Sequence, residues 1–168
     1  PKVDIKGISV SEPNTKGEIT LKANVDTNDS NLKYTYKAYD MENWAAISEE
    51  NDSNTVTWKP KAAGSYLLYL EIKGSTGKVY TYCMGCSVQD SVKIKGMNKS
   101  LSTPQVKKTT IELKGEVSAL FPENLKYDYM VYNGKYWSLL PLNNETKTAA
   151  WKPEKEGSYV LCFQVTDK

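Results

Sequence analysis

The chain contains neither arginine nor histidine, so all 22 of its basic residues are lysines. Without Arg it lacks the forked guanidinium that is preferred for recognising phosphate and guanine. Without His it lacks the commonest general base, the serine and cysteine triads that use one, and nearly all ordinary zinc sites. These absences argue against nucleic-acid readout and leave any catalysis to carboxylates, Lys, Tyr or Cys.

Long apolar runs and an excess of one charge are missing as well. No apolar stretch approaches the roughly 20 residues of a membrane-spanning helix. The net charge of +2 comes from 22 basic and 20 acidic residues spread along the chain, so no basic tract is available for nucleic acid or anionic lipid. We expect no nucleic-acid partner and no direct membrane insertion. Because the chain begins at Pro1 without a leader, we interpret it as a fragment of a larger protein.

What the sequence does contain is an internal repeat. Residues 31–73 align with residues 124–166 at a constant shift of 93, with 16 identities in 43 positions. A repeat of about 90 residues is long enough to bury a core of its own. We therefore predict two modules, residues 1–89 and residues 90–168. The shared segments include Asn-Leu-Lys-Tyr at 31–34 and 124–127, Trp-Lys-Pro at 58–60 and 151–153, and Gly-Ser-Tyr at 64–66 and 157–159.

Inside each copy, apolar and polar residues alternate with the period of a β-strand. Ile19, Leu21 and Ala23 alternate with polar residues, and the second copy repeats the pattern from Ile111. Turn signals recur at roughly ten-residue intervals, which is typical of an antiparallel sandwich. In the first copy we predict strands near 3–10, 17–25, 31–39, 54–59, 64–73 and 78–88, with a short edge segment around 44–48.

Two further signals refine this all-β fold. Gly7 and Gly96 interrupt the alternation of the first strand of each copy, which indicates a bulge or a switch between sheets. Gly-Ser-Tyr looks like the tyrosine corner of immunoglobulin-like and fibronectin-III-like sandwiches. We therefore predict that the hydroxyls of Tyr66 and Tyr159 bond to backbone upstream.

The second copy stops just after the equivalent of Lys73, before any counterpart of the strand at 78–88. We expect the second sandwich to lack its last strand. The strand that follows Tyr159 is then predicted to have an open edge that a neighbouring molecule or loop shields, and the second module to be the less stable one.

Aromatic residues are the compositional excess, with 12 Tyr and 4 Trp. Rings that recur at the same strand positions are predicted to be structural, because a buried ring supplies roughly 150 to 250 Å² of core area. Rings around the Asn133-Gly134 turn, namely Tyr132, Tyr136 and Trp137, are the candidates for stacking on a ligand; the alternative is that they are scattered exposed rings without a function. The structural set is Tyr34, Tyr36, Trp58 and Tyr66 with their counterparts Tyr127, Tyr129, Trp151 and Tyr159.

Two groups of residues invite metal or catalytic chemistry and are interpreted otherwise. Cys83 and Cys86 on an extended strand face opposite sides, about 10 Å apart, and with a distant Cys162 they cannot complete a zinc site. The acidic run at 49–52 becomes Leu-Asn-Asn-Glu at 142–145 in the second copy, so we interpret it as a solvated loop. No catalytic residue, metal ligand or cofactor is expected.

The spaced aromatic residues resemble the triple-tyrosine (Y-Y-Y) module family of bacterial extracytoplasmic proteins. The resemblance implies an immunoglobulin-like module, an extracellular or cell-surface location and no catalytic residue. Such modules stand beside sensor propellers or in tandem arrays on surface proteins. The match is carried by Tyr34, Tyr36, Trp44 and Gly64-Ser65-Tyr66, with Tyr127, Tyr129, Trp137 and Gly157-Ser158-Tyr159.

Three functional hypotheses follow. The first is a non-catalytic spacer or adhesive module of a larger surface or secreted protein, flanked by further repeats or contacting another surface protein. The second is a carbohydrate- or peptidoglycan-binding module that targets an attached cell-wall enzyme. The third is an extracytoplasmic sensor module. An enzyme in its own right is not expected, since no His, Arg or convergent polar cluster is present.

Overall fold

The computed structural model describes residues 1–101 and 109–168 and is built of antiparallel β-sheets. Contacts between Cα atoms divide the chain into two compact units, Pro1–Ser91 (the first module) and Val92–Lys168 (the second module). Each unit is a two-sheet sandwich with its own core. No helix among the described residues is long and apolar enough to cross a membrane.

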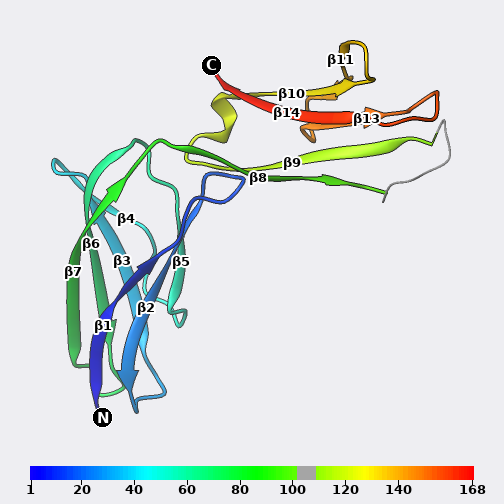
Figure 1. The fold of residues 1–168 in the computed structure, drawn as a ribbon. Helices are drawn as coiled ribbons and strands as arrows, with labels where there is room; N and C mark the ends of the chain where they lie inside the picture. The colour runs from blue at the N-terminus through cyan, green and yellow to red at the C-terminus, as the bar shows by residue number, and fades with distance from the viewer. Residues whose placement is uncertain (102–108) are drawn as a thin grey trace. The chain divides into compact units, whose positions relative to one another are not determined.

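The first module packs a three-stranded sheet against a four-stranded sheet (Figure 1). Each strand predicted for this module is present, with ends within two residues of those expected. The short edge strand is present too. The first sheet has the order β1 (Val3–Val10), β2 (Ile19–Thr27), β5 (Thr55–Trp58); the second has the order β4 (Trp44–Ala46), β3 (Lys33–Tyr39), β6 (Gly64–Lys73), β7 (Val79–Val88).

The core of the first module lies between the apolar faces of these sheets. Residues two apart share a face of a strand, so the alternation in sequence becomes one dry side and one wet side. On β6 the side chains of Leu68, Leu70 and Ile72 are completely buried, and on β2 Leu21 is as well. The intervening residues of both strands are more exposed.

A β-bulge interrupts the first strand of each module, as the glycines predict. The β1–β2 register shifts between Ile5 and Gly7. In the second module the register shifts at the same place, between Ile94 and Gly96. The φ angles of the two glycines, 156° and 154°, lie in a region that side chains rarely adopt, which is why glycine occupies both bulges.

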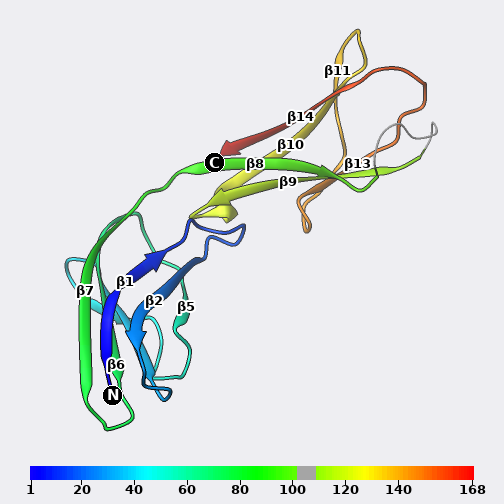
Figure 2. The ribbon, with the colours of Figure 1, turned by 60° about the horizontal axis from the view of Figure 1, so that its bottom comes forward.

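The second module repeats this architecture with one strand fewer (Figure 2). A one-turn 3₁₀ helix, Pro122–Asn124, leads into its tyrosine-containing strand. One sheet has the order β12 (Leu142–Asn143), β13 (Thr148–Trp151), β9 (Ile111–Ala119), β8 (Val92–Lys99); the other has the order β11 (Trp137–Leu139), β10 (Leu125–Tyr132), β14 (Val160–Asp167).

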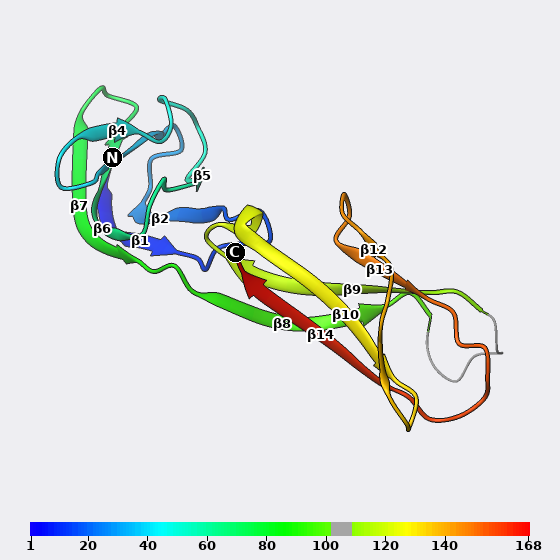
Figure 3. The same ribbon diagram turned by 90° about the horizontal axis from the view of Figure 1, so that it is seen from above.

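The strand that is missing from the second module is the counterpart of β7. The strands β3, β6 and β7 of the first module correspond to β10, β14 and nothing further among the described residues. Strand β14 pairs with β10 from Val160 to Asp167, and its other edge has no strand partner within the described part of the chain. Figure 3 shows β14 and β8 as the outer strands on the same side of the module. The predicted absence of the last strand is therefore confirmed.

Both tyrosine corners form as predicted. The hydroxyl of Tyr66 donates a hydrogen bond to the carbonyl of Ala62 at 2.6 Å, and the hydroxyl of Tyr159 donates one to the carbonyl of Lys155 at 2.7 Å. Each ring meets a buried tryptophan edge-on: Trp58 lies 5.0 Å from Tyr66, and Trp151 lies 5.3 Å from Tyr159. The two tryptophans are 6% and 7% exposed, so both belong to the core, as expected.

Candidate functional site

The exposed aromatic residues gather on one hairpin in each module. In the first module β3 and β4 pair so that Tyr39 lies opposite Trp44. In the second module β10 and β11 pair so that Tyr132 lies opposite Trp137. The turns need a left-handed residue at the same place, where Gly134 has a φ of 97°. The first module uses a methionine at this position, at a φ of 77°.

A side-chain oxygen closes each of these turns. The carboxylate of Asp40 accepts hydrogen bonds from the backbone N–H groups of Glu42 and Asn43, at 2.8 and 2.7 Å. The amide oxygen of Asn133 accepts two equivalent bonds, from Lys135 at 2.9 Å and Tyr136 at 3.1 Å. The two hairpins therefore share one turn geometry, held by a carboxylate in one module and by an amide in the other.

The tyrosine and tryptophan of each hairpin form a tilted ring pair on the surface. The ring centroids are 5.0 Å apart for Tyr39 and Trp44, and 5.2 Å apart for Tyr132 and Trp137, with interplanar angles of 35° and 36°. Trp44 is 53% exposed and Trp137 51% exposed, while Tyr136 beside it is 63% exposed. The repeat therefore conserves an exposed ring platform as well as the core.

The platform of the first module is the larger one. Tyr69 of β6 meets Trp44 edge-on at 6.0 Å, and the ammonium group of Lys37 lies 6.0 Å from the centroid of the Tyr69 ring. These three side chains line an open cavity of about 330 Å³. The Tyr69 hydroxyl donates a hydrogen bond to the carboxylate of Glu71 at 3.3 Å. Desolvation, followed by the charge of that carboxylate, raises the pKa of Tyr69.

This arrangement corrects the expectation that rings crowd around a turn only at 132–137. The first module gathers Tyr39, Trp44 and Tyr69, although the sequence analysis named only Trp44 among them as a motif residue. Lys37 and Tyr69 were missed because they come from neighbouring strands and face each other through the β3–β6 register. The signal that could have found this platform was the alignment of Trp44 with Trp137.

The buried tyrosines of the repeat have a structural role. The hydroxyl of Tyr36 donates to the carbonyl of Asn54, and that of Tyr129 donates to the carbonyl of Lys147, both at 2.7 Å. The Tyr129 hydroxyl also accepts a bond from the N–H of Gly115 at 2.7 Å. Burial raises the pKa of Tyr36 to about 12 and also raises that of Tyr129. Tyr34 and Tyr127 are buried as well, so none of these four phenols faces a ligand.

We predict that acid loosens the first hairpin and leaves the second unchanged. The N–H groups of Asn43 and Glu42 hold the pKa of Asp40 below its ordinary value of 3.8. Since the folded pKa is lowered, the turn bonds are fully present above 3.8 and are lost as the pH falls through the folded pKa. Titration followed by NMR should shift the amide signals of Glu42 and Asn43.

The second hairpin supplies the matched control for this titration. Asn133 carries no ionisable group, so the amide signals of Lys135 and Tyr136 should not move over the same range. Asp40→Asn should make the first hairpin equally insensitive. Equal responses of the two turns in the unmodified chain would contradict the assignment of the acid sensitivity to Asp40.

The acidic loop and the cysteines form no site among the described residues. Asp52 is ion-paired with Lys33, and no group of three or more His, Cys, Asp or Glu in the described part of the chain is placed to hold a metal ion. Cys83, Cys86 and Cys162 are free thiols. Cys83 and Cys86 lie on one extended strand with different exposures, and burial raises the pKa of Cys86.

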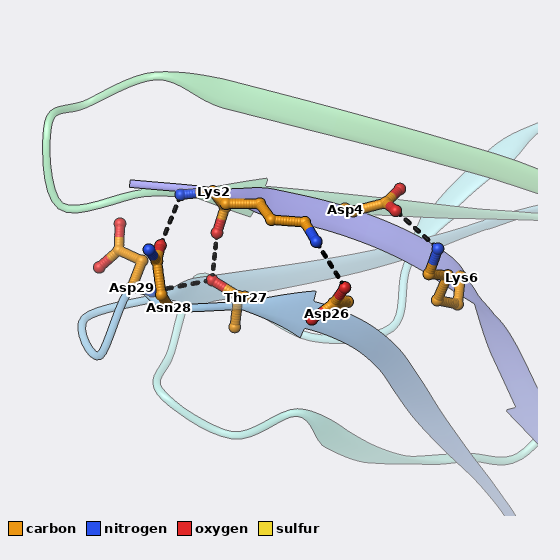
Figure 4. Close-up of polar contacts among 7 residues, drawn as sticks. All are labelled: Lys2, Asp4, Lys6, Asp26, Thr27, Asn28 and Asp29. Atoms are coloured by element: carbon orange, nitrogen blue, oxygen red, sulfur yellow. Dashed lines mark hydrogen bonds and ion pairs between the residues drawn. The ribbon is translucent and has the colours of Figure 1, made fainter.

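Charged side chains on the β1–β2 hairpin pair with one another (Figure 4). The ammonium of Lys2 lies 2.7 Å from the carboxylate of Asp26, and that of Lys6 lies 2.7 Å from Asp4. The backbone N–H of Lys2 also donates to the side chain of Asn28 at 2.6 Å. Such exposed pairs contribute little stability. They do neutralise one another, so these residues do not form a patch of one sign.

Comparison with known proteins supports the fold. No protein-family model matches the sequence, and no curated protein matches it. Among solved structures, the chicken interferon gamma receptor alpha chain superposes with a TM-score of 0.53 at 11% identity, covering 99% of this chain and 90% of that one.

Two further structures are similar at lower scores. The FN1–FN3 domains of chicken CNTN1 give a TM-score of 0.42 at 10% identity, covering 99% of this chain and 62% of that one. The fibronectin(III)-like modules of Clostridium thermocellum CbhA give 0.33 at 16% identity, covering 99% and 86%. The chain consists of two tandem β-sandwiches of the immunoglobulin-like and fibronectin-III-like fold.

Proposed function

We propose that this chain is a non-catalytic spacer or adhesive segment of a larger bacterial protein that is secreted or exposed at the cell surface. The observation that carries the proposal is where the modules use their polar groups. No buried side-chain nitrogen or oxygen of the described residues lacks a hydrogen-bond partner. The buried phenols of Tyr36 and Tyr129 bond to backbone carbonyls of their own modules. Buried polar chemistry therefore stabilises each sandwich instead of facing a substrate.

The repeated pattern of structural aromatic residues supports assignment of both modules to the triple-tyrosine group. The tyrosine corner and the Tyr36 and Tyr129 hydroxyl bonds recur at equivalent positions in the two copies. A spacer needs modules that fold in series and resist extension. An adhesive role would add contacts to another surface protein, and the exposed hairpins provide rings for such contacts.

Force spectroscopy on the chain, held at its two ends, tests the spacer function. Two separate unfolding events are expected, because each module has its own core. The second module should open at the lower force, since β14 has no outer strand partner among the described residues. A single cooperative event for the whole chain would contradict independent modules in series.

A second function, binding of cell-wall polysaccharide, is favoured by the duplicated ring platform. Sugars expose apolar C–H faces that stack on aromatic rings, and polar groups at the rim fix their orientation. Trp44 and Trp137 are half exposed, and each is held by a tyrosine at about the same distance and angle. Lys37 and Glu71 place a cation and a carboxylate at the edge of the first platform.

If polysaccharide binding is the function, retention on insoluble peptidoglycan should depend on the platform tryptophans. We expect Trp44→Ala and Trp137→Ala each to weaken retention about tenfold, equivalent to about 1.4 kcal/mol, through loss of a stacking ring. Leu139→Ala is the control, because Leu139 is 69% exposed on β11 and is not aromatic. Absence of retention by any wall polymer would remove this second function and leave the spacer.

A further inference from the structure

The two modules differ most at one edge, and the first module shows what belongs there. Strand β7 pairs with β6 over ten positions, from Gly64 opposite Val88 to Lys73 opposite Val79. It also contacts β1, where the Tyr82 hydroxyl would lie 3.7 Å from a Cβ added to Gly7. Strand β7 thus closes the sandwich between the edges of two sheets, and Figure 1 shows it beside β1 and β6.

In the second module the same edge leaves core positions uncovered. Leu161, Phe163 and Val165 of β14 are the counterparts of Leu68, Leu70 and Ile72, which are completely buried. All three second-module residues are only partly buried. On the facing edge, Ile94 is 53% exposed and Val92 39% exposed, whereas their counterparts on β1 are partly buried. We call these five residues and the outer edge of β14 the acceptor edge.

The inward direction of the β8 side chains follows from their register. Ile94 lies opposite Val117, and Val92 lies opposite Ala119; both partners on β9 are buried. Directly opposed residues of an antiparallel pair point to the same face of the sheet. Ile94 and Val92 therefore project from the core face, and their exposure reflects a missing neighbour.

The β14 edge also lacks the devices that usually protect an open strand. Its register with β10 runs without a bulge, and its residues from Val160 to Thr166 include no Pro and no charged side chain. Natural sheets commonly protect an edge with a charge, a proline, a bulge or a covering segment. This edge is therefore free to accept backbone hydrogen bonds from an added strand.

We propose that the acceptor edge binds an extended segment of a partner protein, which adds as a strand antiparallel to β14. Main-chain bonds would supply affinity, and apolar side chains at every second position would supply specificity by covering Ile94, Val92 and the open side of Phe163. Strand β7 defines the chemistry of such a segment, because its partly buried residues Tyr80, Tyr82 and Met84 alternate with exposed ones.

A second copy of the chain fits the acceptor edge less well. The apolar side chains of its β14 already pack against its own core, so they are not free to cover Ile94 and Val92. Its β7 is already paired along β6. A separate segment with a free apolar face meets both needs. This inference is independent of sugar binding, because the Tyr132–Trp137 pair lies on β10 and β11 rather than on β14 or β8.

A peptide with the sequence of residues 78–88, with Cys83→Ser and Cys86→Ser to prevent disulfide exchange, is the probe. We expect it to bind the intact chain one to one and to raise the melting temperature of the second module. Hydrogen exchange should show new protection at those β14 amides that do not bond to β10. The control peptide exchanges Tyr80 with Thr81 and Tyr82 with the residue at 83, which moves the rings to the wrong face. It should bind at least tenfold more weakly.

A variant of the chain tests the groove side. Ile94→Ser should leave the free module folded, because the side chain is half exposed, and should weaken peptide binding about tenfold. Equal binding of both peptides, or no binding to a folded second module, would overturn the proposal. So would a chain that sediments as a dimer with its β14 amides already protected, since the edge would then belong to a second copy.

Discussion

Replacing Gly115 by alanine is expected to lower the free energy of unfolding of the second module by about 3 kcal/mol, at the upper end of overpacking costs. A Cβ at this position would lie 2.2 to 2.6 Å from three carbon atoms of the Phe163 ring. The ring cannot retreat easily, because it stacks on Tyr129 at 4.8 Å and meets Tyr127 edge-on at 5.4 Å. The N–H of Gly115 also bonds to the Tyr129 hydroxyl, so movement of the strand would strain that bond.

The first module shows how this clash can be relieved. The positions equivalent to Gly115 and Phe163 hold Ala23 and Leu70, a larger residue facing a smaller one. The double variant Gly115→Ala with Phe163→Leu copies that pair and should recover much of the lost stability. Urea denaturation of the single and double variants gives the coupling free energy, which should be at least 1 kcal/mol for residues in direct contact. An unchanged midpoint for Gly115→Ala alone would contradict the close approach.

Ala23→Gly in the first module is the matched control for this cycle. It inserts no atom, so it should cost only about 1 kcal/mol through lost propensity and a lost methyl group. A larger effect there than at Gly115 would mean that chain flexibility, rather than ring contact, governs this position.

The strand positions could be predicted from sequence because alternation is a local property. Ile19, Leu21 and Ala23 define a face by their spacing alone, and the recurrence of the pattern at Ile111 supports the assignment. The bulge at Gly7 and the tyrosine corner at Tyr66 are local as well, since each depends on residues close together in the chain or in one hairpin. These features were found where the sequence placed them.

Contacts across strands could not be predicted in the same way. The approach of Phe163 to Gly115 and of Lys37 to Tyr69 depends on the register and stacking of strands that are far apart in the sequence. No local pattern fixes that geometry. The internal repeat carried part of this information, because Ala23 and Leu70 change together to Gly115 and Phe163. Two copies are too few to recognise such a paired change without the structure.

The buried tryptophans are expected to give the largest single losses of stability. Trp58→Ala and Trp151→Ala should each cost about 3 to 5 kcal/mol, because each deletes a core ring that packs edge-on against a tyrosine corner. Small domains are stable by only about 5 to 15 kcal/mol in total. A loss of this size is therefore enough to unfold a module that begins near the lower limit.

The two modules should respond differently to this loss. The second module leaves Leu161, Phe163 and Val165 partly exposed where the first buries their counterparts completely, so it has less stability to lose. We expect Trp151→Ala to unfold the second module at room temperature, and Trp58→Ala to leave the first module folded with a lower melting temperature. Trp44→Ala and Trp137→Ala are the matched controls, since both rings are half exposed. If all four variants melted like the unmodified chain, the rings of Trp58 and Trp151 would not be core residues.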